Sequence, residues 1–219
     1  MTSTSTETSS KTTKALLTCG VIAGPLFIIT VLIQAYTRAG FDPKKHPLSL
    51  LALGDLGWIQ TTNFIVSGLL AFASAFGLRQ ILRGSRGGTW GPILIAIYGI
   101  GLVWGGVFAA DPAFGYPVGT PDKAPDELSW HGILHAIAPS AAGIALIAAC
   151  FVFARRFAAQ GQRGWAIYCI VTAVLDLVLT FASFGLADYR VMLLGGAVIW
   201  IWAAVITYKL MNEHRAQLA

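Results

Sequence analysis

Residues 165–185 read "WAIYCIVTAVLDLVLTFASFG" and carry a single charged side chain, that of Asp176. About 20 consecutive apolar residues in a helix are enough to cross the hydrocarbon core of a bilayer. The stretch therefore predicts a transmembrane helix. An acid near the middle of such a helix is costly in lipid and usually faces a bundle interior or an aqueous path. Thr172, Thr180 and Ser183 lie one or two helical turns from Asp176 and extend a polar stripe along the same face.

The rest of the chain repeats this pattern. Of the 219 residues, 56% are hydrophobic and 11% are charged, whereas soluble domains carry about 25% charged residues. Together with the stretch above, six runs are long and apolar enough to span a lipid bilayer, so we expect an all-α, polytopic bundle of six transmembrane helices. The six predicted spans are residues 15–36, 57–78, 90–110, 132–154, 165–185 and 191–208.

The segments outside this bundle are short. Residues 1–14 are rich in Ser and Thr and predict a disordered N-terminal tail. Residues 15–210 form the predicted transmembrane domain, and residues 211–219 a short cytoplasmic tail. The net charge of +5 does not indicate nucleic-acid binding, because the basic residues lie between apolar runs and form no single patch.

The distribution of basic residues predicts the direction of the spans. Six spans place both termini on one side, and the side richer in Lys and Arg is normally cytoplasmic. Arg38, Lys44, Lys45, Lys123 and Arg190 fall on the opposite side. The side of the termini holds twice as many basic residues, so we expect it to be cytoplasmic: Lys11, Lys14, Arg79, Arg83, Arg86, Arg155, Arg156, Arg163, Lys209 and Arg215.

Histidines and acids gather on the predicted outer side. His131 and His135 of "HGILH" are four residues apart and share one helix face, a spacing that can chelate a metal ion. His46 of "KKHPLSLL" and Asp111 of "FAADPAF" could complete a shell suited to zinc. The alternative is that no metal binds, that His131 lies among lipid headgroups, and that His135 hydrogen-bonds a neighbouring helix. No cofactor is required by the sequence.

Other polar groups within the spans favour helix packing. Gln60 and Asn63 predict hydrogen bonds between helices. Tyr98 could hydrogen-bond Asp176. Pro139 cannot donate the backbone bond that the carbonyl of His135 would accept, so that carbonyl needs another partner. The small-residue spacing "GVIAG" (20–24) is typical of closely packed helices.

Three stretches carry a resemblance to a known family. The stretches "HPLSLLALGDLGWIQTTNFIVSGLL" (46–70), "FAADP" (108–112) and "SWHGILHAIAP" (129–139) resemble the bacterial membrane-protein family called domain of unknown function 998. The likeness covers nearly the whole chain after the tail. It implies a six-helix protein of the bacterial inner membrane and implies no particular activity.

A looser likeness concerns transmembrane hydrolases of the alkaline-ceramidase type, which bind zinc through histidines that include an HxxxH pair. Here "HGILH", Ser49 and Asp111 could take those parts. The likeness is limited, because those proteins have seven helices and carry their HxxxH late in the chain.

Three functions remain open from the sequence. The first is a scaffold or regulatory membrane protein with no chemistry of its own. The second is a metal-dependent hydrolase at the outer leaflet, with Asp111 as base or ligand and an amphiphilic lipid or small molecule as its substrate. The third is a proton-coupled carrier of a small solute, with Asp176 as its catalytic residue. A homo-oligomer is compatible with each of them.

Overall fold

The computed structural model describes residues 2–218, with side chains from residue 10 to residue 217. This part of the chain is helical and contains no β-strand. One short 3-10 helix, η1, lies in the loop after the first long helix. The elements are α1 (Thr2–Thr37), η1 (Leu48–Ala52), α2 (Gly57–Ile81), α3 (Trp90–Val107), α4 (Trp130–Ala159), α5 (Arg163–Leu186) and α6 (Tyr189–Leu218).

Six of these helices are long and apolar enough to cross a membrane, which confirms the predicted number and order of spans. Two boundaries differ from the prediction. Helix α1 already begins at Thr2, where a tail was expected over residues 1–14, and α6 continues through most of the tail expected at 211–219. Met1 and Ala219 lie outside the described residues.

Tertiary and local contacts hold the part of each extension that lies next to the bundle. The side chain of Thr13 is buried and its hydroxyl donates a hydrogen bond to the side-chain oxygen of Gln80 on α2. Near the end of α6, Lys209 and Glu213 form an ion pair one turn apart, and Met211 is buried. Helices stabilised by such contacts continue beyond the point where apolar character ends.

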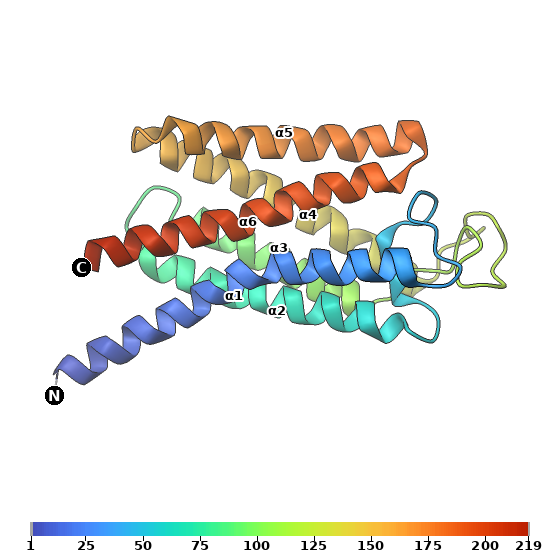
Figure 1. Cartoon of the computed structure of the whole chain (residues 1–219), viewed down its shortest axis with the longest axis horizontal. Helices are drawn as coiled ribbons and strands as arrows, with labels where there is room; N and C mark the ends of the chain where they lie inside the picture. Colours follow the sequence, from blue (N-terminus) through green and yellow to red (C-terminus); the bar gives the residue numbers. More distant parts are fainter. Residues whose placement is uncertain (1, 219) are drawn as a thin grey trace.

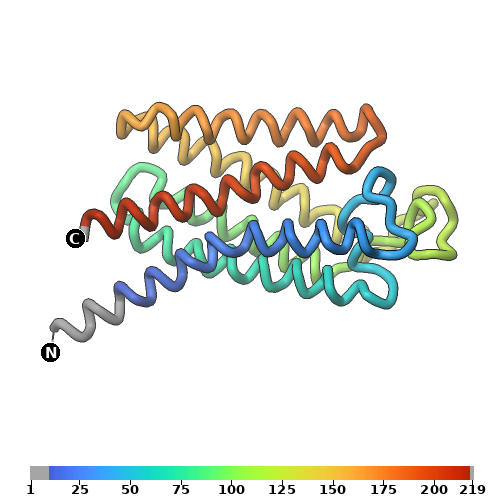
Figure 2. Tube along the Cα trace, viewed as in Figure 1, coloured from blue at the N-terminus to red at the C-terminus, as the bar shows by residue number. Residues whose placement is uncertain are grey.

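The helices form a ring in chain order. Each long helix packs against the next, and α6 returns to pack against α1 (Figure 1). Figure 2 shows that the first coloured part of α1 and the last coloured part of α6 lie at the same end of the bundle. We call this the terminal end. The opposite end carries the two longest loops, residues 38–56 and 108–129, and is called here the long-loop end.

Pairs of glycines bring neighbouring helices into contact. A Cβ atom placed on Gly68 of α2 would lie 2.6 Å from the carbonyl oxygen of Gly99 on α3, and one on Gly99 would lie 2.7 Å from the oxygen of Gly68. On α1, a Cβ at Gly24 would lie 2.5 Å from the oxygen of Trp200. The close packing predicted from "GVIAG" is therefore confirmed.

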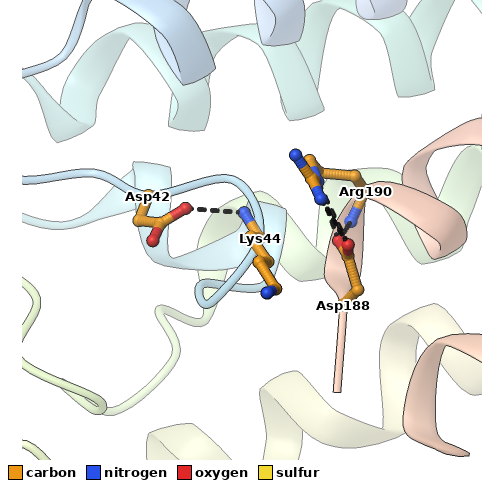
Figure 3. A network of polar contacts seen from close by, with 4 residues as sticks. All are labelled: Asp42, Lys44, Asp188 and Arg190. Atoms are coloured by element: carbon orange, nitrogen blue, oxygen red, sulfur yellow. Dashed lines mark hydrogen bonds and ion pairs between the residues drawn. The ribbon is translucent and has the colours of Figure 1, made fainter. Parts of the chain in front are cut away.

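The turn between α5 and α6 is tied to the first long loop, because the backbone amide of Tyr189 donates to the carbonyl oxygen of Lys44, at 2.8 Å. Within the loop, the amide of Lys44 donates to the Asp42 carboxylate (Figure 3). Within the turn, Arg190 and Asp188 form an ion pair at 2.6 Å. The hydrogen bond from the Arg190 side chain lowers the pKa of Asp188, so this carboxylate stays charged at neutral pH. These contacts close the ring at the long-loop end.

Candidate functional site

His46 joins the two long loops. Its side chain is 3% exposed. The amide of Asp42 donates to its Nδ1 at 2.9 Å, and its Nε2–H donates to the carbonyl oxygen of Phe114 at 2.9 Å. Because a backbone N–H can only donate, Nδ1 must be unprotonated, which assigns the neutral tautomer with the proton on Nε2. Both ring nitrogens are therefore used in holding the loops together.

Arg38, at the end of α1, organises the same region. Its guanidinium group donates to the carbonyl oxygens of Leu51 and Leu56, at 2.8 and 2.7 Å. Longer contacts reach the oxygen of Leu53 and the hydroxyl of Tyr116. In the sequence, this arginine stands out only as a charge in a loop. Its role depends on backbone carbonyls gathered by the fold, for which the sequence carries no signal.

Asp111 caps the beginning of α4. Its carboxylate accepts hydrogen bonds from the backbone amide of Ser129, at 2.8 Å, and from the Ser129 hydroxyl. The Ser129 hydroxyl oxygen in turn accepts from the amide of Gly132 at 3.1 Å. A carboxylate at a helix N-terminus also interacts favourably with the helix dipole. The carboxylate lies so close to Gly132 that an added Cβ would be 2.0 Å from Asp111 Oδ2. This arrangement gives Asp111 a structural role.

The contact between Asp111 and Gly132 predicts that Gly132→Ala destabilises the wild-type chain and stabilises a chain that lacks the Asp111 carboxylate. In the wild-type chain we expect Gly132→Ala to lower the free energy of unfolding by about 1–3 kcal/mol, because the methyl group collides with the Asp111 carboxylate. In an Asp111→Ala background the same change should raise it by about 0.5–1 kcal/mol, since alanine is the better helix former. Chemical unfolding of the four chains in one detergent measures both steps. A loss of equal size in the two backgrounds would show that Asp111 is not packed on Gly132.

The paired histidines of α4 lie in different surroundings. His135 is 7% exposed and its Nδ1–H donates to the carbonyl oxygen of Phe108, at the end of α3, at 2.7 Å. This agrees with a hydrogen bond to a neighbouring helix. His131 is exposed and stacks on Trp130, with 3.5 Å between ring centroids. Next to them, the indole N–H of Trp104 donates to the carbonyl oxygen of Leu134, at 2.9 Å, in the turn that precedes Pro139.

The proposed zinc ligands are not brought together. His46, His131 and His135 have the separate partners described above, and Asp111 is occupied by the α4 cap. Among the residues with described side chains, no three histidine, cysteine or acidic groups lie close enough to hold a metal ion.

Asp176 lies near the midpoint of α5 and is 8% exposed. In the described part of the chain its carboxylate forms no hydrogen bond and no ion pair. A Cβ on Gly195 of α6 would lie 3.4 Å from Asp176 Oδ1, so the acid faces α6. Thr172 and Ser183 are buried on the same helix. The hydrogen bond from Tyr98 considered from the sequence is not formed.

A buried polar column runs along α1 and α2 from Arg38. Gln34 accepts from Arg38, and its amide nitrogen donates to Gln60 Oε1 at 2.8 Å. Asn63 donates to the carbonyl oxygen of Phe27 at 3.2 Å, which confirms that Gln60 and Asn63 bond across helices. Gln60 Oε1 also accepts from Asn63, so its orientation is set by two donors. Gln60 Nε2 is left buried without a partner among the described residues.

These features define a class of protein. Six apolar helices with a ring-like packing and an interior acid are those of a multi-pass helical membrane protein. A family model described as protein of unknown function (DUF998) matches residues 21–209. The chain belongs to this family, which confirms the resemblance found in the sequence. No curated protein and no solved structure matches the chain.

Proposed function

We propose that this protein is a proton-coupled carrier of a small solute and that Asp176 is its proton-binding group. The observation that carries the proposal is a carboxyl group at the midpoint of a membrane-spanning helix, 8% exposed and without a partner among the described residues. Ionisable residues inside a bilayer are expensive and usually belong to ion or proton pathways. A carboxyl group with no structural bond can gain or lose a proton without breaking the fold.

The remaining polar groups support this assignment. His46, His135 and Asp111 are engaged in bonds to the backbone or to a helix cap, so they favour a structural role over that of metal ligands in a hydrolase. In the column of Gln34, Gln60 and Asn63, the amide nitrogen Nε2 of Gln60 is a donor without a partner among the described residues, and a small polar solute could use it. We expect the terminal end to face the cytoplasm of a bacterial cell and the long-loop end to face outward.

The transport prediction concerns Asp176→Asn, which keeps the shape of the side chain and removes its proton chemistry. The protein is reconstituted in liposomes with an entrapped pH dye, and amino acids, carboxylic acids, sugars and amines are added outside in turn. We expect at least one class to change the internal pH with the wild-type protein. Asp176→Asn should reduce that response to the level of empty liposomes.

The matched control is Asp55→Asn, the same change at an exposed acid in the first long loop. It should transport as the wild type does. A solute response that survives in Asp176→Asn would refute the role of this acid. The absence of any solute-induced pH change with the wild-type protein would refute the carrier itself.

A further inference from the structure

A small cavity lies within the ring, among α1, α2, α3 and α6. Its volume is about 10 Å³. Its walls include Gly20, Ser74, Tyr98, Trp200 and Thr207. On one wall α1 packs closely against α2, because a Cβ on Gly20 would lie 2.7 Å from the Cβ of Ser74.

Three residues that carry hydroxyl groups line this cavity, and the bonding of those groups differs. The hydroxyl of Ser74 donates to the carbonyl oxygen of Ala71 at 2.7 Å, and that of Thr207 donates to the oxygen of Ala203 at 2.8 Å. The proton of each of these two hydroxyl groups is therefore used, and its oxygen can only accept from a further partner. Tyr98 is 4% exposed, and its hydroxyl has no hydrogen bond to any other described residue. Its hydroxyl group is therefore a donor without a partner among the described residues, on a residue that lines the cavity.

We infer that one ordered water molecule occupies this cavity and binds Tyr98, Ser74 and Thr207. A cavity of roughly 10–15 Å³ holds a single water, and such a water needs two to four polar partners. Here it accepts from the Tyr98 hydroxyl and donates to the oxygens of Ser74 and Thr207. Inside a bilayer no bulk water can satisfy the tyrosine. No charged side chain lines the space, so the chemistry fits water and not an ion.

This water joins three helices that the ring alone connects in pairs. Tyr98 belongs to α3, Ser74 to α2 and Thr207 to α6. The two helices α3 and α6 are not adjacent in the ring, so the water supplies a polar link across its interior. The site is separate from Asp176 and does not depend on the transport function proposed above.

The effect of Tyr98→Phe on stability tests the inference by its sign. If the hydroxyl binds a water, its removal leaves the water and its acceptors poorly bonded, and the midpoint of thermal unfolding in detergent should fall by about 2–4 °C. If the cavity is dry, the same change deletes an unsatisfied buried group, and the midpoint should stay or rise. The latter result would overturn the inference.

Tyr208→Phe is the matched control, because this tyrosine lies on α6, is 52% exposed and has no hydrogen bond among the described residues. The midpoint of thermal unfolding of Tyr208→Phe should equal that of the wild type. A density map that resolves ordered waters gives an independent reading. It should show one peak within hydrogen-bond distance of the Tyr98 hydroxyl, and an empty cavity in such a map would refute the water site even if Tyr98→Phe is destabilised.

Discussion

Leucine in place of Gly99 is expected to prevent α2 and α3 from packing and to leave the chain unfolded under conditions where the wild type is folded. A Cβ at this position would lie 2.7 Å from the carbonyl oxygen of Gly68 and 2.7 Å from the backbone nitrogen of Phe72. Both obstacles are backbone atoms, which cannot rotate away as a flexible side chain does. Membrane helices rely on such close contact between small residues because the hydrophobic effect contributes little to their association in lipid.

We expect the free energy of unfolding to fall by at least about 3 kcal/mol, the upper part of the range for overpacked interiors. Gly143→Leu on α4 is the control, since no atom outside its own helix lies within 4 Å of a Cβ at that site. Thermal unfolding of both variants in the same detergent compares them. Equal midpoints for Gly99→Leu and Gly143→Leu would show that α2 and α3 are not in contact at Gly99.

Alanine in place of Arg38 should release the loop between α1 and α2. The guanidinium group satisfies the carbonyl oxygens of Leu51, Leu53 and Leu56, and its removal leaves these acceptors without their charged donor. Hydrogen bonds to charged groups contribute about 1.5–3 kcal/mol each. Since some of these oxygens will find water, we expect a total loss of about 3–4 kcal/mol. Arg38→Lys should restore only part of it, because a point-like ammonium cannot span acceptors that a planar fork reaches.

Amide hydrogen exchange locates this effect. The amides of Leu50 and Leu53, which bond within η1, should exchange faster in Arg38→Ala than in the wild type. Arg83→Ala, at an exposed arginine of the terminal end, should leave both unchanged. Unaltered exchange at Leu50 and Leu53 in Arg38→Ala would contradict the role of Arg38 in holding the loop.

More of the fold than of the candidate site could be predicted from the sequence. Runs of about 20 apolar residues define spans almost regardless of tertiary contacts, so the number and order of the helices followed directly. The ends of the helices could not be predicted in the same way, because Thr13 is held by a hydrogen bond to Gln80, a residue far away in the chain. The length of an apolar run carries no information about polar contacts that lie beyond its ends.

The sequence does not reveal those contacts of the site in which a backbone group is the partner. The spacing of His131 and His135 indicates a shared helix face, yet His135 binds the carbonyl oxygen of Phe108 and His131 stacks on Trp130. Any residue at position 108 would offer the same carbonyl, so no side-chain pattern could reveal this bond. Asp176 can be singled out from the sequence, because an acid in the middle of an apolar run is itself the signal.

The most direct test of the account is an infrared difference spectrum of the purified protein in lipid, recorded between an acidic and a neutral pH. If Asp176 exchanges a proton, the wild-type spectrum contains a carboxylic-acid C=O band that disappears in Asp176→Asn and persists in Asp55→Asn. Identical spectra for the wild type and Asp176→Asn would show that this carboxyl group does not change its protonation, and would contradict its assignment as the proton-binding group.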